Sequence, residues 1–136
     1  MKILCLDYGD ARTGVAISDE LGMLAHGVKT IFSHDVIKTA KETAKIVNAE
    51  KVAKIVVGLP KNMDGSEGFR AENTRNFISE LKKYVTLEII EWDERLTTVS
   101  AQRILNEVNV RSLERKKVID TVSAVIILQN YLDSNK

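Results

Sequence analysis

Residues 3–18 read ILCLDYGDARTGVAIS, two short apolar runs separated by a turn that carries two acidic residues and a glycine. The first run, residues 3–6, is apolar at every position, which is typical of a strand buried on both faces of a sheet. The second run, residues 13–18, follows so closely that it predicts an antiparallel neighbour. After another turn at residues 19–22, residues 24–32 predict a third strand. The chain therefore begins as an antiparallel meander.

The pattern changes after residue 33. Apolar residues at helical spacing predict a helix from residue 36 to residue 47, with Ser33 and Asp35 placed to cap it. The rest of the chain predicts a strand at 52–57, a helix at 71–85, a strand at 87–92 and helices from about 99 and over 114–132. This alternation favours parallel pairing, with helices covering the sheet. We therefore expect an α/β fold with a five-stranded mixed sheet flanked by helices.

Composition limits the classes of protein to consider. The chain has 136 residues, of which 44% are hydrophobic and 29% charged, so we expect one globular domain spanning residues 1–136. No apolar run is long enough to span a membrane, and the N-terminus does not resemble a signal peptide. The lone Cys5 lies in an apolar run and is expected to be buried. These features indicate a cytoplasmic protein.

The net charge of +1 does not by itself indicate a nucleic-acid partner. Residues 95–117 nevertheless hold six basic and two acidic side chains, a local charge of +4. Such a stretch is consistent either with a solvated helix face or with a surface that binds phosphates.

Acidic residues follow two of the predicted strands. Asp7 ends the first strand, and either a divalent cation or a turn-capping hydrogen bond would explain a carboxylate there. Asp93 and Glu94 end the fifth strand and must point to opposite faces of the sheet, so only one of them can join Asp7. Taken alone, the pair favours a solvated strand end with a local Glu94–Arg95 contact or a helix-capping role. Because parallel strands end at one edge, and ligands collect there, these acids are also candidate functional residues.

A third acid, Asp120, lies in the last helical pattern. It is either the N-cap of that helix or a residue on the border of its buried face, next to the small residues Ser123 and Ala124. In the second case the helix could approach the sheet closely. Three converging carboxylates would form a site suited to Mg²⁺ or Mn²⁺.

The order and spacing of four motifs resemble the bacterial YqgF/RuvX family. The motifs are LDYGDARTGVA at 6–16, VGLPKNMDG at 57–65, DERLTT at 93–98 and DTVSAVIIL at 120–128. The resemblance implies an RNase H-like fold with sheet order 3-2-1-4-5 and antiparallel strands 1–3. It also implies a nuclease related to the RuvC Holliday junction resolvase and acting on the precursor of 16S rRNA.

The resemblance further implies a set of site residues. Asp7, Glu94 and Asp120 would bind metal, with Asp93 as a further catalytic candidate. Related resolvases carry an acid at the end of the fourth strand, where this chain has residues 58–60, Gly-Leu-Pro. Candidate substrate-binding residues are Gly9, Arg12, Lys61, Asn62, Arg95 and Thr97.

Three functions remain open at this stage. The first is Mg²⁺-dependent (or Mn²⁺-dependent) hydrolysis of precursor rRNA or of branched DNA by a monomer or weak homodimer, with the small ribosomal subunit as a possible partner. The second is a nucleic-acid or ribosome-binding module without catalysis. The third, an actin-like ATPase, requires two lobes of similar fold, and this chain has the length of only one.

Overall fold

The computed structural model describes residues 1–60, 64, 68–93 and 112–134, and in the last range it describes side chains from residue 121 onward. Its elements in chain order are β1 (Ile3–Asp7), β2 (Arg12–Ser18), β3 (Ala25–Phe32), α1 (Val36–Glu50), β4 (Lys54–Leu59), α2 (Phe69–Leu81), β5 (Glu88–Asp93) and α4 (Ser112–Ser134). The helix expected from about residue 99 lies outside the described residues. None of the helices described is both long enough and apolar enough to span a membrane.

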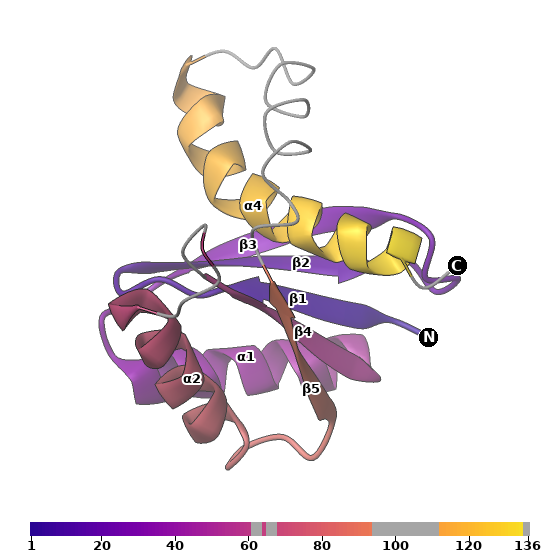
Figure 1. The fold of residues 1–136 in the computed structure, drawn as a ribbon. Coiled ribbons are helices and arrows are strands. Elements are labelled where there is room, and N and C mark those ends of the chain that lie inside the picture. The colour runs from indigo at the N-terminus through magenta and orange to yellow at the C-terminus, as the bar shows by residue number, and fades with distance from the viewer. Residues whose placement is uncertain (61–63, 65–67, 94–111, 135–136) are drawn as a thin grey trace.

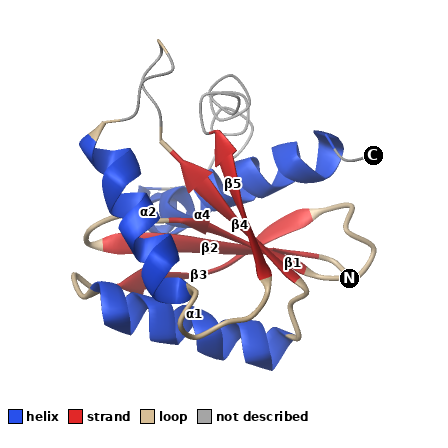
Figure 2. Ribbon diagram, turned by 60° about the horizontal axis from the view of Figure 1, so that its bottom comes forward, coloured by secondary structure: helices blue, strands red, loops and turns tan. Residues whose placement is uncertain are grey.

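The five strands form one sheet in the order β3-β2-β1-β4-β5. β1 pairs antiparallel with β2 and β2 antiparallel with β3, whereas β1, β4 and β5 run parallel. The expected strand order, the antiparallel meander and the mixed sheet are therefore confirmed. β4 and β5 lie side by side and end at the same edge of the sheet (Figure 2).

Helices cover both faces of this sheet. Figure 1 shows α1 and α2 on one face and α4 on the other. The side chains of β1 alternate between these layers: Leu4 and Leu6 pack in the core beneath α1 and α2, while Ile3 and Cys5 pack beneath α4. The continuous apolar run of β1 is thus explained by burial on two sides, and Cys5 is fully buried as expected.

Two helix ends show how far spacing alone can predict. α1 begins after Asp35, whose carboxylate accepts hydrogen bonds from the N–H groups of Ile37 and Lys38, as expected for an N-cap. α2 ends at Leu81, four residues earlier than predicted. Val85 still packs against the same core, and its N–H bonds the carbonyl of Leu81, so the apolar period outlasts the helix.

The last helix lies close to the sheet. A Cβ added to Gly27 in β3 would lie 2.9 Å from both Cβ and Oγ1 of Thr121 in α4, so only a glycine fits there. One turn further along, Ala124 is fully buried against the same face, whereas Ser123 is exposed. The small residues that let α4 approach the sheet closely are therefore Gly27 and Ala124.

Candidate functional site

The carboxyl ends of β1, β4 and β5 define one edge of the sheet, which we call the carboxyl edge. Asp7, Leu59 and Asp93 are the last residues of these three parallel strands. In open sheets with parallel strands, this is the edge at which ligands bind. The acids expected at the ends of the first and fifth strands therefore reach the edge where chemistry was predicted.

Asp7 lies within the sheet and is half-buried. Its Cα pairs with that of Gly14 in β2, which makes it part of the strand ladder rather than of the turn that follows. Because Ile3 and Cys5 face α4, alternation sends the Asp7 side chain to the same face. The carboxylate thus belongs to the layer between the sheet and α4.

Glycines flank Asp7 on both neighbouring strands. Gly14 is its partner on β2, and the β1–β4 register, extended by one residue from the Leu6–Val57 pair, places Gly58 beside it on β4. Neither neighbour has a side chain next to the carboxylate. The sequence offered a signal, since both glycines lie in the quoted motifs, but only the register shows that they flank the same acid.

The turn after Asp7 requires a glycine for steric reasons. A Cβ on Gly9 would lie 2.5 Å from the carbonyl oxygen of Arg12, which is backbone and cannot move aside cheaply. The turn is held further by a 3.1 Å hydrogen bond from the Ser33 N–H to the Ala11 carbonyl. Together they start β2 at Arg12, an exposed residue at the carboxyl edge.

Tyr8 anchors the same turn on the opposite face. Its ring stacks on Phe77 of α2, with 4.4 Å between ring centroids and 11° between planes. Burial, followed by the nearby Asp10 carboxylate, raises the pKa of Tyr8 above its usual value. Tyr8 thus packs against the core beneath α1 and α2, and its direction fixes that of its neighbour Asp7.

The packing of β5 assigns a face to Asp93, one of the two candidate acids. Ile90 and Trp92 pack on the α4 side, whereas Glu91 lies on the α2 side, where its Oε1 is 3.1 Å from Nε of Arg75. Alternation therefore assigns Asp93 to the α2 side, opposite to Asp7. Glu94 and the DERLTT residues that follow it lie outside the described part of the chain.

Asp120 lies inside α4 and not at its start. The helix begins eight residues earlier, at Ser112, so the N-cap alternative is wrong. The helix backbone at position 120 directly precedes Thr121, the residue that touches Gly27 over the sheet. The side chain of Asp120, as well as Lys61, Asn62, Arg95 and Thr97, falls outside what the structure describes, and so does most of the basic stretch at 95–117.

Trp92 borders this layer on the far strand. It pairs with Gly58 across β4 and β5, and its ring meets Tyr131 edge-on at 5.4 Å between centroids. Among the described residues its Nε1 is the only buried side-chain nitrogen or oxygen without a hydrogen-bond partner. Trp92 and Tyr131 thus pack against each other in the core beneath α4.

The described residues alone do not make a metal site. They contain no group of three or more histidine, cysteine, aspartate or glutamate side chains placed to bind one ion. Two of the three expected ligands, Glu94 and Asp120, have no described side chains. Asp7 is the one member of the set that the structure places.

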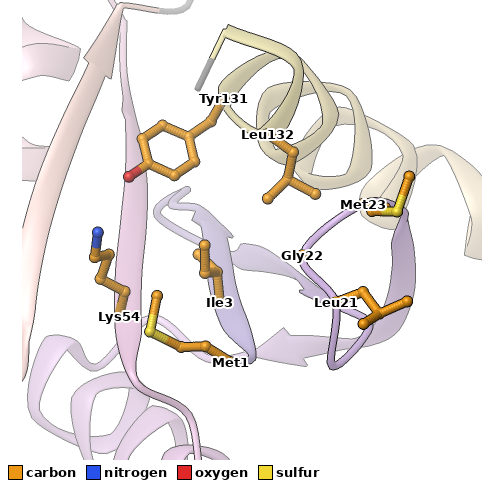
Figure 3. A pocket seen from close by; sticks show the side chains of 8 residues that line it. All are labelled: Met1, Ile3, Leu21, Gly22, Met23, Lys54, Tyr131 and Leu132. Atoms are coloured by element: carbon orange, nitrogen blue, oxygen red, sulfur yellow. The ribbon is translucent and has the colours of Figure 1, made fainter. Parts of the chain in front are cut away.

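A pocket of about 610 Å³ lies at the other end of the sheet. Figure 3 shows it between the start of β1, the β2–β3 turn and the end of α4. Its lining is mostly apolar and includes Ile3, Met23 and Tyr131. Because it opens at the amino ends of the parallel strands, it is separate from the acids.

Known proteins resemble this chain over nearly its whole length. A protein of Ruminiclostridium cellulolyticum is 48% identical over 134 residues, covering 98% of this chain and 94% of the relative, and one of Clostridium tetani is 51% identical over 134 residues, covering 98% and 97%. Both carry the name "Putative pre-16S rRNA nuclease".

Solved structures confirm the fold. T. thermophilus RuvC in complex with a Holliday junction substrate has a TM-score of 0.66 at 10% identity and covers 99% of this chain and 95% of its own. The Fowlpox virus resolvase bound to junction DNA has a TM-score of 0.58 at 14% identity, with 99% of both chains covered. The RNase H-like fold expected from the sequence is therefore correct. The model of the RuvX family, described as Holliday junction resolvase, matches residues 1–134, and the chain belongs to this family.

Proposed function

We propose that this protein is a metal-dependent endonuclease that hydrolyses phosphodiester bonds in the precursor of 16S rRNA. The observation that carries the proposal is the placement of Asp7: a half-buried carboxylate at the end of a parallel strand, with glycines on both sides, facing the helix that contains Asp120. The names of the relatives support the substrate.

Asp7, Glu94 and Asp120 are the metal ligands in this proposal. Asp93 belongs to the α2 side of β5, so an alternating strand would return the next side chain, Glu94, to the side of Asp7. Position 120 precedes the buried Ala124 by one helical turn, which puts it on the sheet-facing stripe of α4. Three carboxylates are a donor set that suits Mg²⁺ or Mn²⁺.

The residues of the proposed site have separate roles in hydrolysis and in substrate binding. Bound Mg²⁺ or Mn²⁺ supplies an activated water and positive charge for the leaving oxygen. The three carboxylates hold the ions and balance their charge. Arg12, at the same edge and on the same face as Asp7, binds a neighbouring phosphate. Lys61, Asn62, Arg95 and Thr97 are proposed to extend this contact along the nucleic-acid backbone, with the Gly9 turn close to it.

Glu94 takes the place of the acid that related resolvases have at the end of the fourth strand. In this chain that position is beside Asp7 and is occupied by Gly58, which has no side chain. A carboxylate reaching in from the neighbouring strand has the space that the glycine leaves. In the proposal, an acid that follows β5 thus replaces one at the end of β4, and the edge keeps three acids.

A second candidate substrate is a four-way DNA junction. The description of the family and the likeness to two junction-bound resolvases favour it. Resolution of a junction needs two active sites and hence a homodimer, whereas cleavage of rRNA needs only a monomer. Maturation of rRNA would place the protein in the cytoplasm, with the small ribosomal subunit as a partner.

The test is cleavage of labelled 16S precursor RNA and of a four-way junction by the purified protein, with Mg²⁺ or with EDTA. We expect Mg²⁺-dependent cleavage of the precursor. Asp7→Asn should reduce it by at least a hundredfold with the fold unchanged by circular dichroism. Asp10→Asn, an exposed acid in the same turn, is the matched control and should cleave normally.

Undiminished cleavage by Asp7→Asn would reject the assigned site. Faster cleavage of the junction than of the RNA would reject the proposed substrate. Wild-type protein that binds RNA without cutting it would identify a binding module.

A further inference from the structure

Phe32 lies at the carboxyl edge because its strand, β3, runs in the same direction as β1, β4 and β5. β3 is antiparallel to β2, and β2 to β1, so β3 ends where β1 ends. The Cα of Phe32 pairs with that of Arg12, while Asp7 pairs with Gly14 two residues further along β2. With about 4.8 Å between strands and 3.4 Å per residue, the Cα atoms of Phe32 and Asp7 are about 12 Å apart.

Phe32, Arg12 and Asp7 share one face of the sheet. Ile31 and Val15 pack in the core beneath α1 and α2, so alternation directs Phe32 and Arg12 to the other side. Asp7 is directed to that side by the same rule. An aromatic ring and a guanidinium therefore stand on the acid-bearing face, beside the site proposed above.

The exposure of Phe32 is not explained by the fold. Its side chain is 69% exposed, whereas the preceding Ile31 is 5% exposed. Burying a phenylalanine would stabilise the fold by about 2 kcal/mol, a gain that this position gives up. Single exposed apolar residues are common, so the place matters more than the exposure. The other exposed phenylalanine, Phe69, begins α2 after β4 and is also at this edge.

We propose that Phe32, with Arg12 beside it, stacks on an unpaired base of the nucleic-acid strand whose phosphate is held at Asp7. The inference rests on the nuclease function proposed above and narrows its substrate. An exposed ring offers a face to any base, and arginine adds phosphate contact and cation–π attraction. At about 3.4 Å per stacked nucleotide, the base is roughly two to four nucleotides from the scissile phosphate.

The subsite selects single strands. A base within a continuous duplex is covered by its neighbours and cannot present its face to a side chain, whereas bases in loops, ends and splayed strands can. The substrate is therefore single-stranded on the Phe32 side of the cut.

The experiment compares Phe32→Leu with Phe32→Tyr. Leucine keeps the apolar character and removes the aromatic face, while tyrosine keeps the ring. Both are made in the Asp7→Asn background, so that bound strands stay intact. Fluorescence anisotropy then measures binding of a labelled 12-nucleotide single-stranded RNA and of the same sequence as a duplex.

We expect Phe32→Leu to weaken single-strand binding by roughly 5- to 100-fold, as for loss of one base–aromatic stack. Duplex binding should not change, and Phe32→Tyr should bind like the parent. Leu24→Ala, which alters an exposed apolar residue at the opposite edge, is the control and should have no effect. Because Phe32 is exposed, the melting temperatures of these variants should match.

Equal single-strand affinity of Phe32→Leu and the parent would overturn the subsite. Weaker binding to the small ribosomal subunit with unchanged binding of the RNA would also overturn it, and would assign Phe32 to a protein contact. If the wild type does not cleave RNA but Phe32→Leu still loses single-strand affinity, the hydrolysis fails and the base subsite stands.

Discussion

At the scale of single residues, the candidate site depends on glycines, which have no side chain. Gly14 and Gly58, which flank Asp7 on the two adjoining strands, have no side chains, and Gly9 admits the carbonyl of Arg12. Gly9 cannot be replaced without a shift of the backbone, because an added Cβ would lie 2.5 Å from the carbonyl oxygen of Arg12. The strand positions on both sides of Asp7 are thus backbone only, which leaves room for a ligand at those positions.

The consecutive acids Asp93 and Glu94 give a matched pair of substitutions. Glu94→Gln should reduce Mg²⁺-dependent cleavage by at least a hundredfold, because it removes a proposed metal ligand. Asp93→Asn should retain cleavage within about threefold, because alternation turns Asp93 to the α2 side. Initial rates of precursor cleavage at saturating Mg²⁺ measure both. The reverse order of effects would exchange the two roles.

At the scale of elements, the position of α4 over the sheet depends on a tight contact with β3. Thr121 lies against Gly27 of β3, and Ala124 follows one turn later over the same face. A helix this close carries position 120 toward the strands, whereas a larger residue at 27 would push it away. The contact between α4 and the outer strand β3 therefore sets how close position 120, which holds a proposed ligand, lies to the sheet.

Gly27→Ala should destabilise the protein by about 1–3 kcal/mol, because its new methyl overlaps Thr121. Thr121→Gly should partly rescue it, with a coupling of at least about 0.5 kcal/mol in a double-mutant cycle. Thr121→Ala should rescue less, since its Cβ stays 2.9 Å from the added one. Urea denaturation measures all of these variants. Simple additivity of the Gly27 and Thr121 effects would show that the helix shifts freely.

Periodicity predicted the elements better than their ends and faces. The apolar runs predicted every described strand to within about two residues, and the signal was plainest for β1, β2 and β4, which are buried along almost their whole length. The end of α2 was missed because Val85 packs from a loop at a helical spacing. The sequence left the faces of Asp93 and Glu94 open because Ile89 and Ile90 are both apolar. In the structure Ile89 packs in the core beneath α1 and α2 and Ile90 in the core beneath α4, which assigns Asp93 to the α2 side.

At the scale of the whole molecule, the proposed ligands come from three distant parts of the chain. Asp7 lies at the start, Glu94 after the fifth strand and Asp120 in the last helix. The sequence showed the acids and the edge at which strands end. It could not show that glycines flank Asp7, because this follows from the registers of two strand pairs.

Ligands so far apart make metal binding a property of the folded state. Mg²⁺ at ten times its Kd should stabilise the protein by about 1.4 kcal/mol and raise Tm by roughly 4–6 °C. Asp7→Asn should lose this shift, while Asp10→Asn should keep it. Thermal melts with Mg²⁺ and with EDTA provide the measurement, which needs no substrate. An equal shift in Asp7→Asn would place the ion elsewhere.

The position of α4 after all five strands has a consequence for synthesis. Its residues Ala124, Ile127, Leu128 and Tyr131 form one side of the second core. A polypeptide that grows from its N-terminus therefore completes the strands before the helix that covers one face of the sheet. During that interval the nascent protein lacks both this apolar cover and the proposed carboxylate of Asp120, so in the proposed mechanism it cannot hydrolyse RNA before α4 is made.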